Sequence, residues 1–216
     1  MEKNYTRFLM DLDGTIIDSG EGVTRSVQYA LAALGIEEKD RNCLNRFIGP
    51  PLKDSFRDFY GFTPDQVRKA IEKYRERYVA EGLYENKVYE GIEEILRAWK
   101  EKGKKVYVCT SKPEIYARKI LNELGLDIYF DFIGGAMLDG TRDSKEEVMA
   151  YLLQRIPVTD VSSCVMIGDR KFDVLAAGRL GMDSIGVLYG YGDRAELEAA
   201  GATYIVNAPG DLKRWG

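Results

Sequence analysis

The sequence predicts an α/β fold in which a doubly wound parallel sheet carries a small inserted α-helical domain. From about residue 90 onward, short segments that are apolar throughout alternate with helical patterns. Parallel strands buried on both faces give such continuous apolar runs, and their alternation with helices is typical of a doubly wound sheet. The stretch from 18 to 86 departs from this alternation, because it contains helical patterns and no convincing strand.

Six strands are expected in the sheet. They are Arg7–Met10, Val106–Cys109, Phe132–Gly135, Cys164–Ile167, Ile185–Leu188 and Thr203–Val206. Between them, apolar residues recur at helical spacing from Ile92 to Trp99 and from Ile115 to Leu124. Ser144 and Glu147 form a capping box, which predicts that a further helix begins there.

The inserted segment defines the predicted domain boundaries. Residues 1–17 and 87–216 form the sheet domain, and residues 18–86 form the helical domain. Thr63 and Gln66 make a capping box with Pro64 at the first helical position, which favours a helix start. Because the insert follows the first strand, we expect it beside the carboxyl ends of the strands, where open α/β sheets bind ligands. The insert is therefore a candidate lid.

Composition excludes several classes of function. The 216 residues include no histidine, so serine–histidine hydrolysis, histidine-bound zinc and phosphohistidine chemistry are ruled out. A metal would need oxygen ligands, which favours Mg²⁺, Mn²⁺ or Ca²⁺. The three cysteines lie far apart without a CxxC pair, so the sequence indicates neither a zinc finger nor a disulfide framework.

Charge and hydropathy limit the kinds of partner that the protein is expected to bind. Lysine and arginine number 31 against 35 acidic residues, and the net charge of −4 gives no indication of nucleic-acid binding. No segment reaches the ~18 apolar residues that a membrane span needs, and the first residues lack the apolar core of a signal peptide. We expect a cytoplasmic protein with no nucleic-acid or membrane partner.

Two aspartates follow the first expected strand, in Asp11-Leu12-Asp13-Gly14-Thr15. Side chains alternate along a strand, so Asp11 and Asp13 share an orientation, and without a cation their charges would repel each other. A simple Asp-Gly turn is the alternative and stays open at this point. An EF-hand calcium loop fails, because Gly22 stands where the bidentate Glu is needed and no helix precedes Asp11.

Hydroxyl groups and a lysine follow at two further strand ends. Thr110 and Ser111 close the strand at 106–109, and Pro113 is expected at the first position of the next helix, whose N-terminus could receive an anion. The alternative is that Ser111 only caps that helix. Lys145 follows the N-cap Ser144, where a positive charge opposes the helix dipole unless a phosphate is bound. A solvent-exposed lysine is the alternative there.

The fourth group follows the strand at 164–167, in Gly168-Asp169, with Asp173 four residues beyond Asp169. Asp169 can face the same cleft as Asp11, and Asp173 lies one helical turn further on. Later, Gly190-Tyr191-Gly192 begins a match to the G-x-G-x-x-A dinucleotide fingerprint. It has one short strand after it, so we favour a glycine-rich connection over dinucleotide binding.

Taken in order, these groups resemble the four motifs of the haloacid dehalogenase (HAD) superfamily: Asp11-x-Asp13-Gly14-Thr15, Thr110-Ser111, Lys145, and Gly168-Asp169 through Asp173. The helical insert resembles the small C1-type cap of that superfamily. The resemblance covers essentially the whole chain and implies a Rossmann-like HAD core. Three segments of the chain resemble the phosphoglycolate phosphatase and 5′-nucleotidase-like branch of that superfamily: Ile48–Leu52, Gly168–Lys171 and Gly190–Gly192.

The resemblance implies a phosphoric monoester hydrolase. Asp11 would be the nucleophile that forms an aspartyl-phosphate, and Asp13 would act as general acid and then as general base. Mg²⁺ would be held by Asp11, Asp13 through its backbone carbonyl, and Asp169. Asp173 would be an outer-sphere partner of the metal or a group that orients Lys145. The phosphate would be bound by Thr110, Ser111 and Lys145.

The expected substrate is a small phosphorylated metabolite. We favour phosphoglycolate, because Arg46 and Lys53 in the insert could meet an anionic substrate. Nucleoside 5′-monophosphates are the alternative, and so is the interpretation of Arg46 and Lys53 as solvated charges on a helix face. A phosphomutase of the same fold would also use Asp11 and Asp13, so that activity stays open too.

Overall fold

The computed structural model describes residues 3–158 and 160–216, which form two compact units. One unit consists of the chain up to Ile17 together with Val88–Gly216, and we call it the core unit. The other is Asp18–Lys87, which we call the helical unit.

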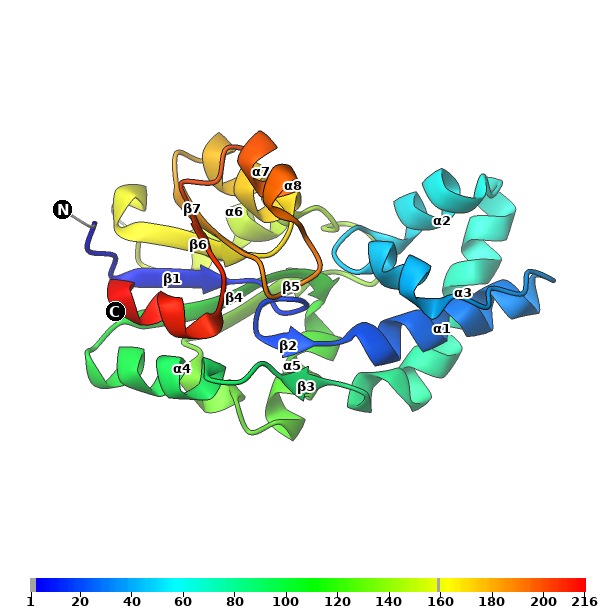
Figure 1. The fold of residues 1–216 in the computed structure, drawn as a ribbon, viewed down its shortest axis with the longest axis horizontal. Helices are drawn as coiled ribbons and strands as arrows, with labels where there is room; N and C mark the ends of the chain where they lie inside the picture. The colour runs from blue at the N-terminus through cyan, green and yellow to red at the C-terminus, as the bar shows by residue number, and fades with distance from the viewer. Residues whose placement is uncertain (1–2, 159) are drawn as a thin grey trace. The chain divides into compact units, whose positions relative to one another are not determined.

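The core unit is built on a parallel sheet. Within the described residues the sheet has six strands in the order β5-β4-β1-β6-β7-β8 (Figure 1). The strands are β1 (Arg7–Met10), β4 (Lys105–Pro113), β5 (Phe132–Ala136), β6 (Cys164–Gly168), β7 (Asp183–Val187) and β8 (Tyr204–Val206). The predicted doubly wound α/β fold is confirmed.

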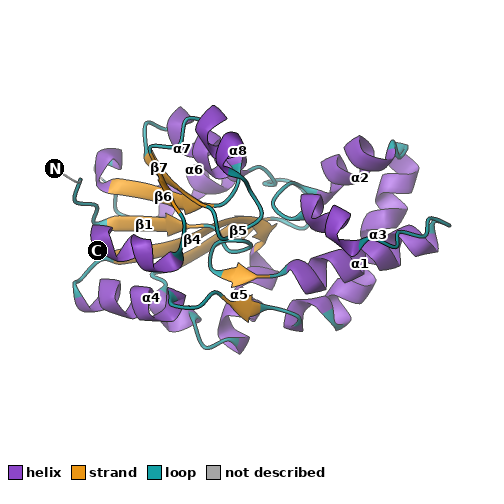
Figure 2. Ribbon diagram, viewed as in Figure 1, coloured by secondary structure: helices purple, strands orange, loops and turns teal. Residues whose placement is uncertain are grey.

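Helices cover both faces of this sheet. They are α4 (Ile92–Glu101), α5 (Glu114–Glu123), α6 (Lys145–Arg155), α7 (Lys171–Arg179) and α8 (Arg194–Ala199), with 3₁₀ segments at Asp127–Tyr129, Val161–Ser163 and Pro209–Trp215. Figure 2 shows α4 and α5 on one side of the sheet and α6 and α7 on the other. Phe8 of β1 stacks on Trp99 of α4, with ring centroids 4.0 Å apart, whereas Leu9 belongs to the apolar cluster that includes Val148 and Leu152 of α6. Burial on both faces explains why these strands are apolar throughout.

The helical unit contains α1 (Gly20–Ala33), α2 (Leu52–Tyr60) and α3 (Pro64–Ala80), with 3₁₀ segments at Arg41–Phe47 and Gly82–Tyr84. The predicted capping box at the start of α3 is confirmed: the backbone N–H of Gln66 donates to Thr63 Oγ1, and the Gln66 side chain accepts from the Thr63 N–H at 3.0 Å. Ala70, Tyr74 and Tyr78 form the buried side of α3, which packs against α1.

The chain passes between the two units at two neighbouring points. β2 (Ile17–Asp18) and β3 (Lys87–Val88) form a two-stranded sheet there. In addition, the backbone N–H of Tyr89 donates to the carbonyl oxygen of Ile16 at 3.1 Å. Strands of two residues are too short to give a periodic pattern, which is why the sequence predicted no strand at either point.

The end of β4 differs from the prediction. β4 continues to Pro113, and α5 begins at Glu114 with Pro113 at its N-cap position. Pro113 is therefore not the first helical residue, and Ser111 does not cap the helix. The strand is longer because its pairing with β5 shifts register between Thr110 and Pro113, which marks a β-bulge. Ile115, expected on the apolar face of α5, is 63% exposed.

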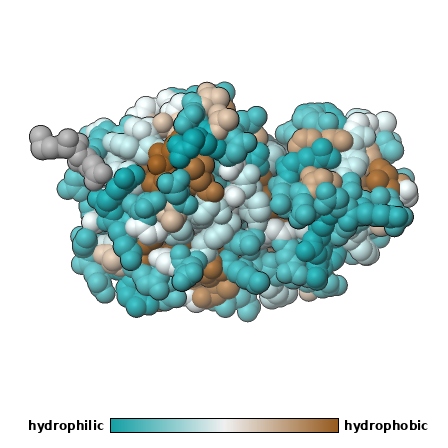
Figure 3. All heavy atoms as spheres, viewed as in Figure 1, coloured by the Kyte–Doolittle hydropathy of each residue, from teal (hydrophilic) through white to brown (hydrophobic). Residues whose placement is uncertain are grey.

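The surface carries mainly hydrophilic side chains. On the face drawn in Figure 3, hydrophobic residues occur in small separate areas. Exposed large apolar side chains such as Ile115, Ile128 and Leu175 belong to different elements of the core unit. No helix among the described residues is long enough and apolar enough to cross a lipid bilayer.

Candidate active site

The candidate site lies at the carboxyl edge of the sheet. β1 lies between β4 and β6, so the residues that end or follow these three strands meet at one edge, and α6 adds its first residue. Six charged residues are buried in the part of the chain that the structure describes, and all six come from these segments and the first turn of α7: Asp11, Asp13, Lys112, Lys145, Asp169 and Asp173.

Asp11 is held through one of its two carboxylate oxygens. Oδ1 accepts a hydrogen bond from the backbone N–H of Leu12 at 2.7 Å and lies 2.8 Å from Nζ of Lys145. The backbone N–H of Asp11 donates to the carbonyl of Ile167 at 2.9 Å, which ties the residue to β6. Oδ2 has no hydrogen-bond partner among the described residues. The carboxylate is therefore fixed in place with one oxygen left available.

Lys145 lies among three oxygen atoms. Its Nζ is 2.8 Å from Asp11 Oδ1, 2.8 Å from Asp173 Oδ1 and 2.9 Å from the carbonyl oxygen of Cys109. These three oxygens match the three N–H donors of an ammonium group. Burial alone would lower the pKa of Lys145, but the two carboxylates raise it above its ordinary value. Lys145 is a buried, fully charged cation, so the alternative of a solvent-exposed lysine is wrong.

Asp173 has both carboxylate oxygens engaged. Oδ1 forms the ion pair with Lys145, and Oδ2 accepts from the backbone N–H of Arg170 at 3.2 Å, at the start of α7. Burial raises the pKa of Asp173 to about 6, although the charge of Lys145 acts in the opposite direction. Of the two roles that the sequence left open, this geometry fits the one in which Asp173 orients Lys145.

Asp169 has one oxygen bound and one without a partner. Oδ2 accepts from the backbone N–H of Tyr191 at 2.7 Å, whereas Oδ1 is buried and has no hydrogen-bond partner among the described residues. Burial and the nearby carboxylates raise the pKa of Asp169 well above its ordinary value. Gly14 has φ +79°, and a Cβ there would lie 2.1 Å from Asp169 Oδ2, so only glycine allows this approach.

The glycine-rich segment Gly190–Gly192 thus contributes to this site through its backbone. Its central N–H, that of Tyr191, holds Asp169. This supports its interpretation as a connection after a strand, since β7 ends at Val187 and α8 begins at Arg194.

The site has the charge and the donor atoms of a site for a divalent cation. Carboxylate oxygens of Asp11, Asp169 and Asp173 lie within 4.8 Å of one another. The four buried carboxylates face two buried ammonium groups, which leaves two negative charges uncompensated. A buried carboxylate oxygen without a partner is costly, and a hard cation would satisfy Asp169 Oδ1. The residues present therefore fit a metal ion such as Mg²⁺.

Asp13 belongs to a separate ion pair. Its Oδ1 lies 2.8 Å from Nζ of Lys112, and both side chains are buried. Thr110 is buried beside them, with its Oγ1 accepting from the backbone N–H of Lys112 at 3.2 Å, and Ser111 is half-buried. No sequence pattern singled out Lys112. The available signal was its place two residues after Thr110, which puts both on the same side of an extended chain.

The family follows from a comparison of the whole chain with known proteins. The profile of haloacid dehalogenase-like hydrolases matches residues 8–187. The chain belongs to this family. A Pseudomonas aeruginosa protein named 5′-nucleotidase is 48% identical to this HAD hydrolase over 200 residues, which are 93% of this chain and 90% of the relative. An Aquifex aeolicus phosphoglycolate phosphatase is 30% identical over 213 residues, covering 94% and 93%.

The fold of this HAD hydrolase agrees with a solved structure. The crystal structure of a predicted phosphatase from Clostridium acetobutylicum is 43% identical, superposes with a TM-score of 0.95, and covers 98% of both chains. Together with the family match and the phosphatase names of the relatives, this makes the HAD hydrolase an enzyme of the phosphatase class.

The helical unit of the HAD hydrolase contains Arg46 and Lys53, the two cationic residues that we expected from the sequence to contact the substrate. The guanidinium of Arg46 lies over the ring of Phe59, 4.4 Å from its centroid, and 5.5 Å from that of Tyr60. Lys53 is exposed on the first turn of α2. Arg46 is therefore partly occupied by aromatic packing within its own unit.

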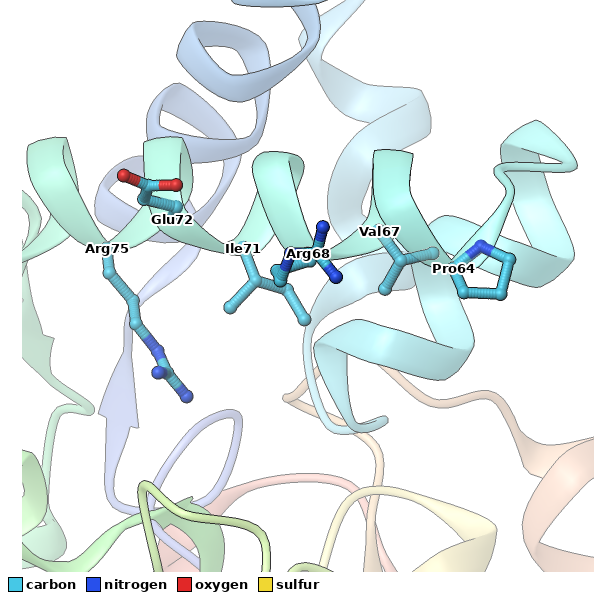
Figure 4. A pocket seen from close by; sticks show the side chains of 6 residues that line it. All are labelled: Pro64, Val67, Arg68, Ile71, Glu72 and Arg75. Atoms are coloured by element: carbon cyan, nitrogen blue, oxygen red, sulfur yellow. The ribbon is translucent and has the colours of Figure 1, made fainter.

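A hollow of about 510 Å³ lies along one side of α3 in the same unit. Figure 4 shows the side chains that line it: Pro64, Val67, Arg68, Ile71, Glu72 and Arg75. Val67 and Ile71 are four residues apart and share one side of the helix, next to the buried Ala70 and Tyr74. The sequence analysis proposed none of the lining residues as part of a functional site.

Proposed function

We propose that this HAD hydrolase cleaves small phosphomonoesters by transferring the phosphoryl group first to Asp11 and then to water. The unequal environment of the two Asp11 oxygens is the observation that supports this most. Oδ1 is held by the Leu12 N–H and by Lys145, whereas Oδ2 keeps its lone pairs free of hydrogen bonds to the described residues. Such an oxygen, fixed at the end of a buried strand, is suited to in-line attack on phosphorus.

Asp13 serves both steps as the proton carrier. In the first step it gives a proton to the leaving oxygen while the bond between that oxygen and phosphorus breaks. In the second it takes a proton from the water that attacks the phosphoryl group on Asp11, and the carboxylate of Asp11 is released. Its position two residues after the nucleophile, just beyond β1, supports this division of labour.

Mg²⁺ completes the site in this proposal. Asp11 and Asp169 would hold it through their carboxylates and Asp13 through its backbone carbonyl. When bound, it neutralises negative charge on the phosphate. Asp173 stays outside this ligand set, because its two oxygens are engaged by Arg170 N–H and Lys145.

The phosphate would be bound by Thr110, Ser111 and Lys145. The hydroxyl oxygen of Thr110 accepts from the Lys112 N–H, which leaves its own O–H to donate to a phosphate oxygen. Lys145 contributes a charge that does not depend on pH in the neutral range, because two carboxylates keep its pKa raised. A fixed cation and oriented donors are what phosphoryl transfer requires of a protein.

For the substrate we now favour nucleoside 5′-monophosphates over phosphoglycolate. The relative named 5′-nucleotidase is 48% identical to this chain, against 30% for the relative named phosphoglycolate phosphatase. Arg46, which had favoured an anionic substrate, is stacked on Phe59. Phosphoglycolate stays the second candidate, on the strength of that second relative.

The test is turnover with Mg²⁺ across a panel of phosphomonoesters that includes nucleoside 5′-monophosphates, phosphoglycolate and sugar phosphates. We expect kcat/KM to be highest for a nucleotide and to be unchanged in Arg46→Ala, with Arg57→Ala as a control on α2. A higher value for phosphoglycolate that drops in Arg46→Ala would reverse the choice of substrate. Isomerisation of a sugar phosphate without phosphate release would show a phosphomutase instead.

A further inference from the structure

Lys112 is buried against Asp13, although the mechanism proposed above assigns it no role. Its Nζ lies 2.8 Å from Asp13 Oδ1, and the exposed fractions of the two side chains are 6% and 12%. Burying two charges costs desolvation energy, which their attraction repays only in good geometry. The short contact meets that condition, so the pair is held in a defined arrangement.

The backbone of β4 is distorted where it presents Lys112. Thr110 is paired with Gly135 of β5 and Pro113 with Ala136, so the two residues between them on β4 face no residue of their own on β5. A bulge of this kind bends the strand and redirects a side chain, and bulges are frequent beside active sites. Here Lys112 is one of the two residues in the bulge.

Two contacts hold the bulge in this shape. Thr110 Oγ1 accepts from the Lys112 N–H at 3.2 Å, which closes a turn across the bulge. On the neighbouring strand, a Cβ on Gly135 would lie 2.7 Å from the carbonyl oxygen of Lys112 and 2.7 Å from Cα of Glu114. Only a glycine at 135 lets the bulged segment approach β5 so closely, so both strands contribute to the position of Lys112.

Lys145 cannot take over this contact with Asp13. The three oxygens around its ammonium belong to Asp11, Asp173 and Cys109, and they match its three donors. Each of the two aspartates that flank Leu12 therefore has a lysine of its own.

We propose that Lys112 is a positioning residue that fixes the orientation of the Asp13 carboxyl group, so that Oδ2 is the oxygen that faces the leaving group. This inference rests on the proposed role of Asp13 as proton carrier. Oδ1 accepts from the ammonium group of Lys112, which leaves Oδ2, without a hydrogen-bond partner among the described residues, as the oxygen that exchanges a proton with the leaving group. That proton passes from Oδ2 to the leaving oxygen as the P–O bond breaks, and Oδ2 later accepts a proton from water. Lys112 keeps its own protons throughout.

The test compares two substrates of similar size with different needs for a proton. Benzyl phosphate releases an alkoxide and needs general-acid help, whereas p-nitrophenyl phosphate releases a stable phenolate. For Lys112→Met we expect kcat/KM to fall by about 100-fold with benzyl phosphate and by less than about 5-fold with p-nitrophenyl phosphate, since general acid catalysis is worth about 10²–10⁴-fold. Lys112→Arg keeps a cationic N–H donor and should recover most of the loss.

Two further variants control the comparison. Lys105→Met removes another lysine of β4, one that pairs with Asp131 at 2.9 Å on the exposed end of the strand, and should leave both substrates unaffected. The double variant Asp13→Asn/Lys112→Met removes both charges of the pair, so it keeps the test usable if Lys112→Met does not fold. We expect it to be no slower with benzyl phosphate than Asp13→Asn alone.

Three outcomes would overturn the inference. An equal loss of kcat/KM with both substrates in Lys112→Met would show a structural role for Lys112. So would a loss in the double variant that equals the product of the losses in the two single variants. These results leave the proposed function standing as long as Asp13→Asn loses more activity with benzyl phosphate than with p-nitrophenyl phosphate. Wild-type activity with benzyl phosphate in Asp13→Asn would instead overturn the proposed function and the inference together.

Discussion

The two units of this HAD hydrolase differ in whether they bury charged side chains. All six charged residues that are buried in the described chain lie in the core unit, whereas the buried polar side chains of the helical unit are hydroxyls only: Ser19, Thr24, Ser26 and Ser55. Ion pairs of the helical unit, such as Arg57 with Asp54, are largely exposed. Buried charges are costly, while exposed pairs contribute little to stability. The same kind of substitution should therefore have very different effects in the two units.

The largest difference is expected when one aspartate in each unit is replaced by asparagine. Asp11→Asn should lower kcat by at least about 10⁴-fold, because an amide does not attack phosphorus, while the fold persists. Asp54→Asn in α2 should keep kcat within about twofold. Phosphate release with saturating substrate and Mg²⁺ measures both. Comparable losses in the two variants, or activity retained in Asp11→Asn, would refute the assignment of the nucleophile.

The next difference concerns stability. Lys145→Met leaves Asp11 and Asp173 without their cation, and the free energy of unfolding should fall by about 3 kcal/mol at about pH 8. The loss should be smaller at about pH 5, where Asp173, whose pKa burial raises to about 6, takes up a proton instead. Arg57→Met, the matched change in the helical unit, should cost less than about 0.5 kcal/mol. Urea unfolding of the metal-free proteins compares them.

The metal-free core unit should also depend on pH in a direction opposite to that of an ordinary paired carboxylate. Burial raises the pKa of Asp173 to about 6, whereas an unfolded Asp has a pKa of about 3.9. Between these values the folded protein holds a proton that the unfolded chain has released. The contribution of Asp173 to the free energy of unfolding therefore falls as the pH rises from about 4 to about 6, by up to about 3 kcal/mol.

Mg²⁺ should counteract this loss, because a bound cation favours the ionised carboxylates. The increase in Tm that millimolar Mg²⁺ produces should be larger at about pH 7.5 than at about pH 5. Asp169→Asn should remove most of the increase, since Asp169 Oδ1 is a buried carboxylate oxygen without a hydrogen-bond partner among the described residues. An increase that is equal at both pH values, or that survives in Asp169→Asn, would contradict the proposed metal site.

The smallest effect tests the one well-shielded cation of the helical unit. Arg77 pairs with Glu85 at 2.9 Å, and the exposed fractions of the two side chains are 11% and 20%. Burial on this scale is intermediate between that of Lys145 and that of Arg57. Arg77→Met should therefore lower the free energy of unfolding by about 1 kcal/mol, measured by urea unfolding. A loss as large as that in Lys145→Met would erase the contrast between the units.

What the sequence predicted correctly depends on local patterns. Apolar runs and helical periodicity placed the strands and helices, and the capping box at Thr63 and Gln66 placed the start of α3. The same patterns put Asp11, Thr110 and Asp169 at the ends of strands that turn out to be neighbours in the sheet. A parallel sheet brings such residues together once its strand order is known.

What the sequence did not predict depends on contacts between distant residues. The ion pair of Lys112 with Asp13 joins residues 99 positions apart. The bulge in β4 requires a glycine at position 135 on another strand, and no sequence pattern within β4 itself predicts the bulge. For Lys145, the residues alone left a surface position open as the alternative, because its three oxygen partners come from three separate segments.

The adjacency of the two crossing points between the units has an evolutionary consequence. Ile16 and Tyr89 are joined by a backbone hydrogen bond, and β2 pairs with β3, so the insert leaves and re-enters the core at one place. For the core, the whole insert is a closed loop, and doubling the length of such a loop costs only about 0.6 kcal/mol of closure entropy. Lineages can therefore enlarge, shrink or exchange the insert while the strands that carry the aspartates stay unchanged.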